Sequence, residues 1–231
     1  MSYWDAGADG YKKPGKIIER PQGYEFVGLS TFCDINDYEK IDHLIPVCKT
    51  RESSPCSILI YDDQREDWVE LVDQVKVGDV EYYFSSFYVY GKSLNVPVRL
   101  RHGYLGDNGY TDLMALMRRK GAVDGEAQVV IFNNRKSSGY LNTTFEITAL
   151  NEMKNIRPLS ASFFDLYEDG VFDIFVSYET INSSGTTLAL QSLSLKEFAG
   201  VNFVKILVTS GLCTEGSCFE KRRLQGFKNN L

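Results

Sequence analysis

Three segments of the chain share one pattern of apolar and polar positions: an apolar run, a polar loop that ends in aspartate, and a second apolar run. The loops span 34–42, 104–112 and 165–173. The runs after the loops are short and apolar at consecutive positions, as in 113–117 and 174–176. Short runs bounded by polar turns predict β-strands, and consecutive apolar positions are typical of strands buried on both faces.

The closing aspartates, Asp42, Asp112 and Asp173, recur at intervals of 70 and 61 residues. Two further apolar runs follow each unit, so that each repeat is predicted to hold four short strands. A four-stranded repeat of about 60 residues has the size of a propeller blade with long loops. The sequence therefore predicts an all-β partial β-propeller. Its expected parts are a remnant of a preceding blade at 1–23, three blades at 24–95, 96–155 and 156–210, and a truncated, divergent tail at 211–231.

The loops resemble calcium-binding loops of the form D-x-D/N-x-D-G-x-x-D, in which side chains at positions 1, 3, 5 and 9 and the carbonyl at position 7 bind the ion. Calcium prefers six or more such oxygens. The second loop lacks most of these groups. The alternative is that the aspartates cap turns by accepting backbone hydrogen bonds. The candidate calcium ligands are Asp165, Asp169, the carbonyl of Val171 and Asp173 in the third loop, and Asp34, Asn36, the carbonyl of Lys40 and Asp42 in the first.

Composition narrows the function classes. The 231 residues include 25 basic and 31 acidic side chains, a net charge of −6, which disfavours a nucleic-acid module with a broad basic face. Aromatic residues make up 13% of the chain, which favours strands. No run approaches the roughly 20 apolar residues of a membrane helix, and the first residues lack the pattern of a signal peptide.

The cysteines and sequons point to an oxidising compartment. Cys48 and Cys56 bracket one polar turn, and Cys213 and Cys218 bracket another. Both pairs predict disulfides at hairpin tips, although four reduced thiols are the alternative, and Cys33 is expected to be a buried free thiol. The sequons at Asn142 and Asn182 lie in polar stretches and are candidate glycosylation sites. Together these features favour a secreted context, so the missing signal sequence predicts a fragment, an isoform or an incomplete gene model.

The loops resemble FG-GAP repeats of the integrin alpha type. Three stretches are more specifically similar to the T-cell immunomodulatory protein (linkin) family: 163–174, 42–48 with Cys56, and 202–213. The resemblance covers roughly residues 10–218 and implies a C-terminal part of an extracellular propeller in a glycosylated, single-pass membrane protein. It also implies roles in cell adhesion and in modulation of immune cells, without enzymatic activity. The chain has no match to the family's signal peptide, first blades or membrane helix, and 219–231 departs from the family pattern.

The sequence thus predicts a non-enzymatic extracellular interaction module of a cell-surface glycoprotein, with a protein partner and no nucleic acid. One alternative is a calcium-braced scaffold without a binding role as a fragment. A second alternative is a propeller-type glycoside hydrolase, which requires two carboxylates at hydrolase spacing outside the loops. The two histidines, His43 and His102, are expected to be packed or exposed side chains rather than general bases.

Overall fold

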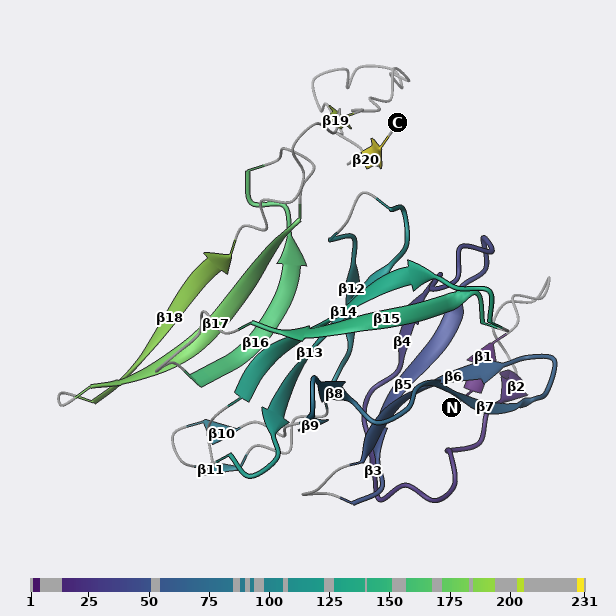
Figure 1. Ribbon diagram of the computed structural model, residues 1–231, viewed down its shortest axis with the longest axis horizontal. Coiled ribbons are helices and arrows are strands. Elements are labelled where there is room, and N and C mark those ends of the chain that lie inside the picture. The colour runs from purple at the N-terminus through teal and green to yellow at the C-terminus, as the bar shows by residue number, and fades with distance from the viewer. Residues whose placement is uncertain are drawn as a thin grey trace, which may run out of the picture.

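The computed structural model describes residues 2–4, 14–50, 55–84, 88–89, 92–93, 98–105, 108–122, 127–139, 141–150, 157–167, 172–182, 185–193, 203–205 and 228–230. All regular secondary structure within these residues is β, as predicted, and it forms three main antiparallel sheets (Figure 1). Within the described residues, no helix is long and apolar enough to cross a bilayer.

The first sheet holds five antiparallel strands. They are β3 (Phe26–Val27), β4 (Thr31–Cys33), β5 (Asp42–Cys48), β6 (Cys56–Asp62) and β7 (Asp67–Val72). The order is β3-β5-β6-β7, and β4 pairs with β5 beside β3. One edge of β5 is therefore shared by two short strands, with Thr31 opposite Leu44 and Phe26 opposite Cys48.

The second sheet repeats this arrangement. It contains β8 (Lys76–Val77), β9 (Val80–Phe84), β12 (Arg101–Gly103), β13 (Asp112–Arg119), β14 (Ala127–Lys136) and β15 (Thr143–Ala149). Here β12 and β9 share one edge of β13, as β4 and β3 share one edge of β5. Strands β8 and β9 lie within the range 24–95, yet they belong to the second sheet, because β9 pairs with β13.

The third sheet consists of β16 (Arg157–Phe164), β17 (Asp173–Asn182) and β18 (Gly185–Leu193) in sequential order. Three two-stranded pairs complete the described structure. They join β1 (Ser2–Trp4) with β2 (Pro14–Ile17), β10 (Tyr88–Val89) with β11 (Lys92–Ser93), and β19 (Phe203–Lys205) with β20 (Lys228–Asn230).

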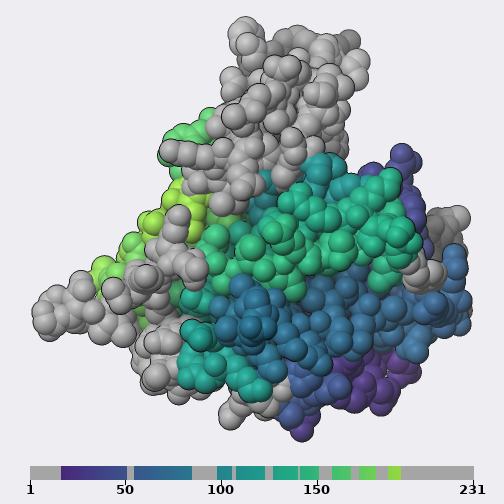
Figure 2. Space-filling model, viewed as in Figure 1, coloured from purple at the N-terminus to yellow at the C-terminus, as the bar shows by residue number. Residues whose placement is uncertain are grey.

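The second sheet is buried on both faces, because it lies between the first and third sheets (Figures 1 and 2). Side chains of β13 alternate between two cores: Leu113, Ala115 and Met117 face the first sheet, and Met114 and Leu116 face the third. The first core includes Leu44, Ile58 and Ile60 of the first sheet, and the second core includes Ala161, Ile174 and Val176 of the third. Each buried leucine or methionine of this kind contributes roughly 1.5–3 kcal/mol, so this stacking is the main source of stability.

The two outer faces of the stack differ. On the third sheet, Phe164, Leu188 and Leu190 are 53%, 55% and 65% exposed, as expected for an open stack. On the first sheet, Ile45, Val47 and Leu59 are buried in a small core that includes Tyr24 and Trp68. The outer apolar face is therefore exposed at the third sheet and largely covered at the first.

Gly28 sits where the first sheet meets the segment leading into the second. The Gly28 N–H donates to the Pro46 carbonyl at 2.8 Å, and the next residue, Leu29, donates to the Val98 carbonyl at 2.8 Å. A Cβ atom at Gly28 would lie 2.6 Å from the Val98 oxygen and 2.7 Å from Pro46 Cγ. Only glycine fits this approach without movement of the backbone.

We expect Gly28→Ala to destabilise the fold by about 1–3 kcal/mol, because the added methyl group overpacks against the Val98 oxygen and Pro46 and forces the backbone to shift. Urea unfolding measures the change. Gly139→Ala is the matched control, since the atom nearest to a Cβ there is Ser137 Oγ at 3.5 Å. Equal stability of the two variants would contradict the close contact at Gly28.

Candidate functional site

The three predicted loops share one geometry. Each loop begins after a strand residue that pairs with the closing aspartate: Cys33 with Asp42, Gly103 with Asp112, and Phe164 with Asp173. In each, the closing carboxylate accepts a hydrogen bond from the backbone N–H seven residues earlier. The donor–acceptor distances are 3.0 Å from Ile35 to Asp42, 2.7 Å from Leu105 to Asp112 and 3.4 Å from Leu166 to Asp173. The aspartates therefore brace the loops in the way that the turn-capping alternative predicts.

The first loop also gathers candidate ligands for a cation. Asp34 accepts a hydrogen bond from the Tyr38 N–H at 3.2 Å. Asn36 is 8% exposed, and its Oδ1 atom has no hydrogen-bond partner. Burial raises the pKa of the Asp42 carboxyl group, and the nearby charge of Asp34 adds to the shift. Lys40, whose carbonyl is a predicted ligand, forms a 2.6 Å salt bridge to Asp63 through its side chain.

The third loop is described in part. Asp165 and Asp173 lie at its two ends and Asp173 is buried, whereas Asp169 and Val171 lie outside the described residues. Among the described residues, no group of three or more His, Cys, Asp or Glu side chains is arranged to hold a metal ion.

A buried polar network at Asn134 joins the first and second sheets, and sequence reasoning did not find it. The Asn134 side chain is fully buried, and its Nδ2 atom donates to the carbonyl of Ile35 in the first loop at 2.7 Å and to that of Thr111 at 3.0 Å. Its backbone N–H donates to Asp112 Oδ1 at 2.7 Å, and the Thr143 hydroxyl donates to its Oδ1 atom. One amide thus connects the first loop to the second.

The predicted glycosylation site Asn142 lies beside this network. Its backbone has a left-handed φ of 55°, and its side chain is half-buried. The Nδ2 atom, to which a glycan would be attached, donates to the Asn36 carbonyl at 3.3 Å. The other predicted site, Asn182, ends β17, and its side chain lies outside the described part of the structure.

The structure contains the disulfide Cys48–Cys56. The two cysteines face each other across β5 and β6 and are buried, which confirms the prediction for this pair. Cys33 is a buried free thiol, as predicted, and burial raises its pKa to about 12. Cys213 and Cys218 lie outside the described residues.

Four aromatic rings form a row across the outer face of the first sheet. Phe32 stacks on His43 with ring centroids 4.7 Å apart, and Trp68 meets both His43 and Tyr61 edge-on at 4.8 and 5.4 Å. His43 is buried, its Nε2 atom lies 2.8 Å from Ser30 Oγ, and burial lowers its pKa to about 4. His43 is therefore a neutral packing residue at pH 7, in agreement with the sequence-based expectation.

We expect acidification to destabilise the protein through His43. The unfolded chain binds a proton near pH 6.5, whereas the folded His43 binds one near pH 4, so stability falls as the pH drops between these values. His43→Phe keeps a ring but cannot titrate. Urea unfolding at pH 7.5 and 5.0 should show a loss about 1–2 kcal/mol larger in the unmodified protein than in the variant. Equal losses would contradict a buried neutral His43; the raised pKa of Asp42 is common to both proteins.

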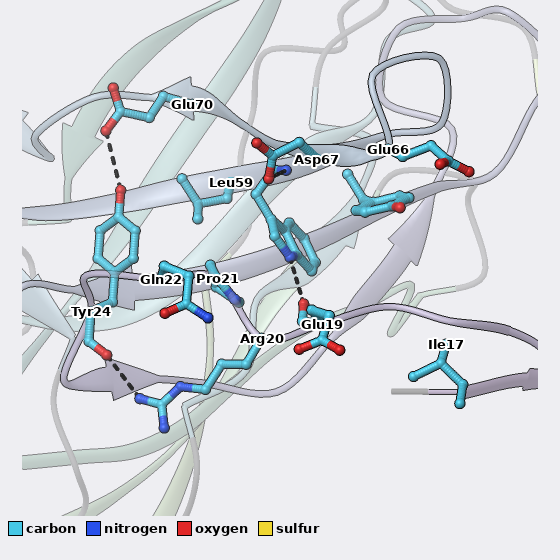
Figure 3. A pocket seen from close by; sticks show the side chains of 12 residues that line it. Ile17, Glu19, Arg20, Pro21, Gln22, Tyr24, Leu59, Glu66, Asp67 and Glu70 are labelled. Atoms are coloured by element: carbon cyan, nitrogen blue, oxygen red, sulfur yellow. Dashed lines mark hydrogen bonds between the residues drawn. The ribbon is translucent and has the colours of Figure 1, made fainter.

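A cleft of about 730 Å³ lies on the same outer face of the first sheet, between the segment 17–24 and strands β6 and β7 (Figure 3). Its lining includes the rings of Tyr24, Tyr61 and Trp68. Sequence reasoning missed this cleft because its two walls lie about 40 residues apart in the chain, and neither carries a recognisable motif.

Comparison with known proteins gives relatives of one kind. The chain is 27% identical to human T-cell immunomodulatory protein over 214 residues, which cover 89% of this chain and 34% of that protein. It is 26% identical to the mouse protein of the same name over 86% of this chain and 33% of that protein. It is also 25% identical to protein linkin of Caenorhabditis elegans over 84% of this chain and 31% of that protein.

These relatives confirm the resemblance inferred from the loop motifs. The chain spans about a third of the length of the curated relatives that it matches. No family model and no solved structure matches the chain.

Proposed function

We propose that this homologue of T-cell immunomodulatory protein and linkin is a non-enzymatic, extracellular interaction module built from blades of a β-propeller. The observation that carries the proposal is the threefold repetition of one strand–loop–strand unit in three face-to-face sheets, each closed by a buried or half-buried aspartate. Stacked four-stranded repeats of this size are how propellers bury their sheets. The names of these relatives, T-cell immunomodulatory protein and linkin, support an immune or adhesion-related role at the cell surface.

The chemistry of the loops favours binding over catalysis. Asp42 and Asp112 use their carboxylates to hold backbone N–H groups at 3.0 and 2.7 Å, so these acids stabilise the loops rather than face a substrate. A rigid loop that presents backbone and exposed side chains, such as Tyr38, suits recognition of another protein. The disulfide between Cys48 and Cys56 supports an extracellular location, since such bonds persist in oxidising compartments.

The proposal is tested by binding to cells. The full chain is produced through a secretory pathway, multimerised on a fluorescent tag and incubated with T cells. We expect saturable binding that excess unlabelled chain displaces. A folded chain, verified by circular dichroism, that binds no better than the tag alone would contradict the proposed interaction role.

We propose, as a second function, that the first loop binds Ca²⁺ weakly and braces the stack. Asn36 Oδ1 supports this, because a buried amide oxygen without a partner is costly unless a ligand satisfies it. Asp34 and Asp42 supply charge in the same loop, and the predicted carbonyl ligand comes from Lys40. The third loop, with Asp165, Asp169, Val171 and Asp173, remains a calcium proposal by the same sequence pattern.

Calcium titration tests the first loop. With free Ca²⁺ tenfold above the dissociation constant, we expect the free energy of unfolding to rise by about 1.4 kcal/mol. Asp34→Asn should remove this gain, whereas Asp37→Asn, an exposed loop residue with φ of 60° outside the ligand pattern, should retain it. Absence of any stabilisation at millimolar Ca²⁺ would eliminate the calcium role and leave the interaction module untouched.

A further inference from the structure

The cleft on the outer face of the first sheet is held open by hydrogen bonds from its own walls (Figure 3). Trp68 Nε1 donates to the Glu19 carbonyl at 2.9 Å, and Tyr24 Oη donates to Glu70 Oε1 at 3.3 Å. Arg20 Nη2 donates to the carbonyls of Tyr24 and Glu25 at 2.8 and 3.1 Å. These bonds fix the segment 17–24 across strands β6 and β7, so the cleft is formed before any ligand arrives.

The charge of the cleft is strongly negative. Glu19, Glu66, Asp67 and Glu70 line it and are exposed. Among the lining residues, Arg20 is the sole basic side chain, and its guanidinium group donates to the backbone carbonyls of Tyr24 and Glu25. The negative potential of this face therefore favours a cationic group.

The walls of the cleft are aromatic. Trp68 and Tyr61 meet edge-on at 5.4 Å, and Tyr24 lies beside Glu70. Burial raises the pKa of the Tyr24 hydroxyl, and the Glu70 charge adds to the shift, so Tyr24 stays neutral. Aromatic faces next to carboxylates form the combination that attracts guanidinium groups, which stack on rings and bond to carboxylates at the same time.

We propose that this cleft binds an arginine side chain presented by a protein partner. Arginine fits better than lysine because its planar fork can stack on Trp68 or Tyr61 while it donates to Glu66 or Glu70. The proposal deepens the interaction role and rests on it, since it names the chemistry of the partner at one surface of the proposed module.

The intrinsic fluorescence of Trp68 gives a direct assay. The chain has two tryptophans, Trp4 and Trp68, so Trp4→Phe leaves Trp68 as the sole indole. The probe is a blocked peptide, Gly-Arg-Gly-Arg-Gly, and its partner is the same peptide with citrulline in place of arginine. We expect a saturable change in Trp68 fluorescence with the arginine peptide, weakened by added salt, and no change with the citrulline peptide.

Charge removal tests the carboxylates. Glu66→Gln and Glu70→Gln should each weaken arginine-peptide binding by roughly two- to fivefold. Asp79→Asn removes the same charge from an exposed turn outside the cleft and should leave the affinity unchanged. Equal binding of the citrulline peptide, or unchanged binding in both glutamine variants, would overturn the proposal. A change in Trp68 fluorescence when the protein concentration is raised without any peptide would also overturn the proposal. It would indicate that a second copy of the chain fills the cleft.

The two proposals fail in different ways. If T cells bind the chain and the Glu66→Gln/Glu70→Gln variant equally, and no arginine peptide binds, the cleft is not the recognition site and the interaction role stands. If the arginine peptide binds but cells do not, the interaction role fails while the cleft chemistry holds.

Discussion

Asn134→Ala is expected to destabilise the protein by about 3–4 kcal/mol. The substitution removes the amide that donates to the carbonyls of Ile35 and Thr111 at 2.7 and 3.0 Å. It also removes the acceptor of the Thr143 hydroxyl. Three polar groups in a buried region would lose a hydrogen-bond partner. A fully buried polar group without a partner costs about 1–3 kcal/mol, and a partly buried one costs less. Urea unfolding at pH 7.5 measures the loss.

The adjacent Asn133 provides the control. It lies on the same strand, β14, but is only half-buried, and alternation along the strand turns its side chain to the other face. Asn133→Ala should cost less than about 1 kcal/mol. If both alanine variants lost the same stability, Asn134 would not be the connection between the first and second sheets.

The second large effect is expected from the disulfide. Replacement of Cys48 and Cys56 by alanine should reduce the free energy of unfolding by about 2–3 kcal/mol. The bond joins residues eight positions apart, so it restricts the unfolded chain across a short loop while its sulfur atoms stay buried in the core. Both cysteines are replaced because a single substitution would leave one of them as a free thiol. Thermal unfolding of the variant, compared with the unmodified protein under oxidising conditions, measures the difference.

Cys33→Ala is the matched control for this experiment. Cys33 is a buried free thiol in the same core but closes no loop, so its loss should cost about 1 kcal/mol through packing alone. An additional test is reduction: dithiothreitol should destabilise the unmodified protein and leave the double variant unchanged. Insensitivity of the unmodified protein to reduction would contradict the bond.

Local features of the fold could be predicted from the sequence. Asp42, Asp112 and Asp173 each begin a central strand and bond to the backbone seven residues earlier, and the polar loop before each of them predicted a turn followed by a strand. The Cys48–Cys56 bond was predictable because both partners flank one turn. In each case the signal and its structural consequence lie within about ten residues of the chain.

Features that depend on distant contacts could not be predicted. Asn134 bonds to Ile35, which lies 99 residues earlier, and nothing in its local sequence marks it as buried. Strand β9 joins the second sheet because it pairs with one edge of β13, a strand that lies about 30 residues later in the chain. The paired residues are Met117 with Phe84, Arg118 with Tyr83 and Arg119 with Tyr82. The cleft beside Trp68 likewise arises only when the segment 17–24 packs on β6 and β7.

The stacking of the three sheets is most directly tested by two methionines on one strand. Met114 and Met117 are both fully buried in β13 but point to opposite faces, one toward the third sheet and the other toward the first. With methionine methyl groups labelled by carbon-13 and nuclear Overhauser contacts recorded to assigned methyls, Met117 should contact the core of Leu44 and Ile58, and Met114 that of Ile174 and Val176. Contacts of both methionines to the same sheet, or to neither, would contradict the stacked arrangement.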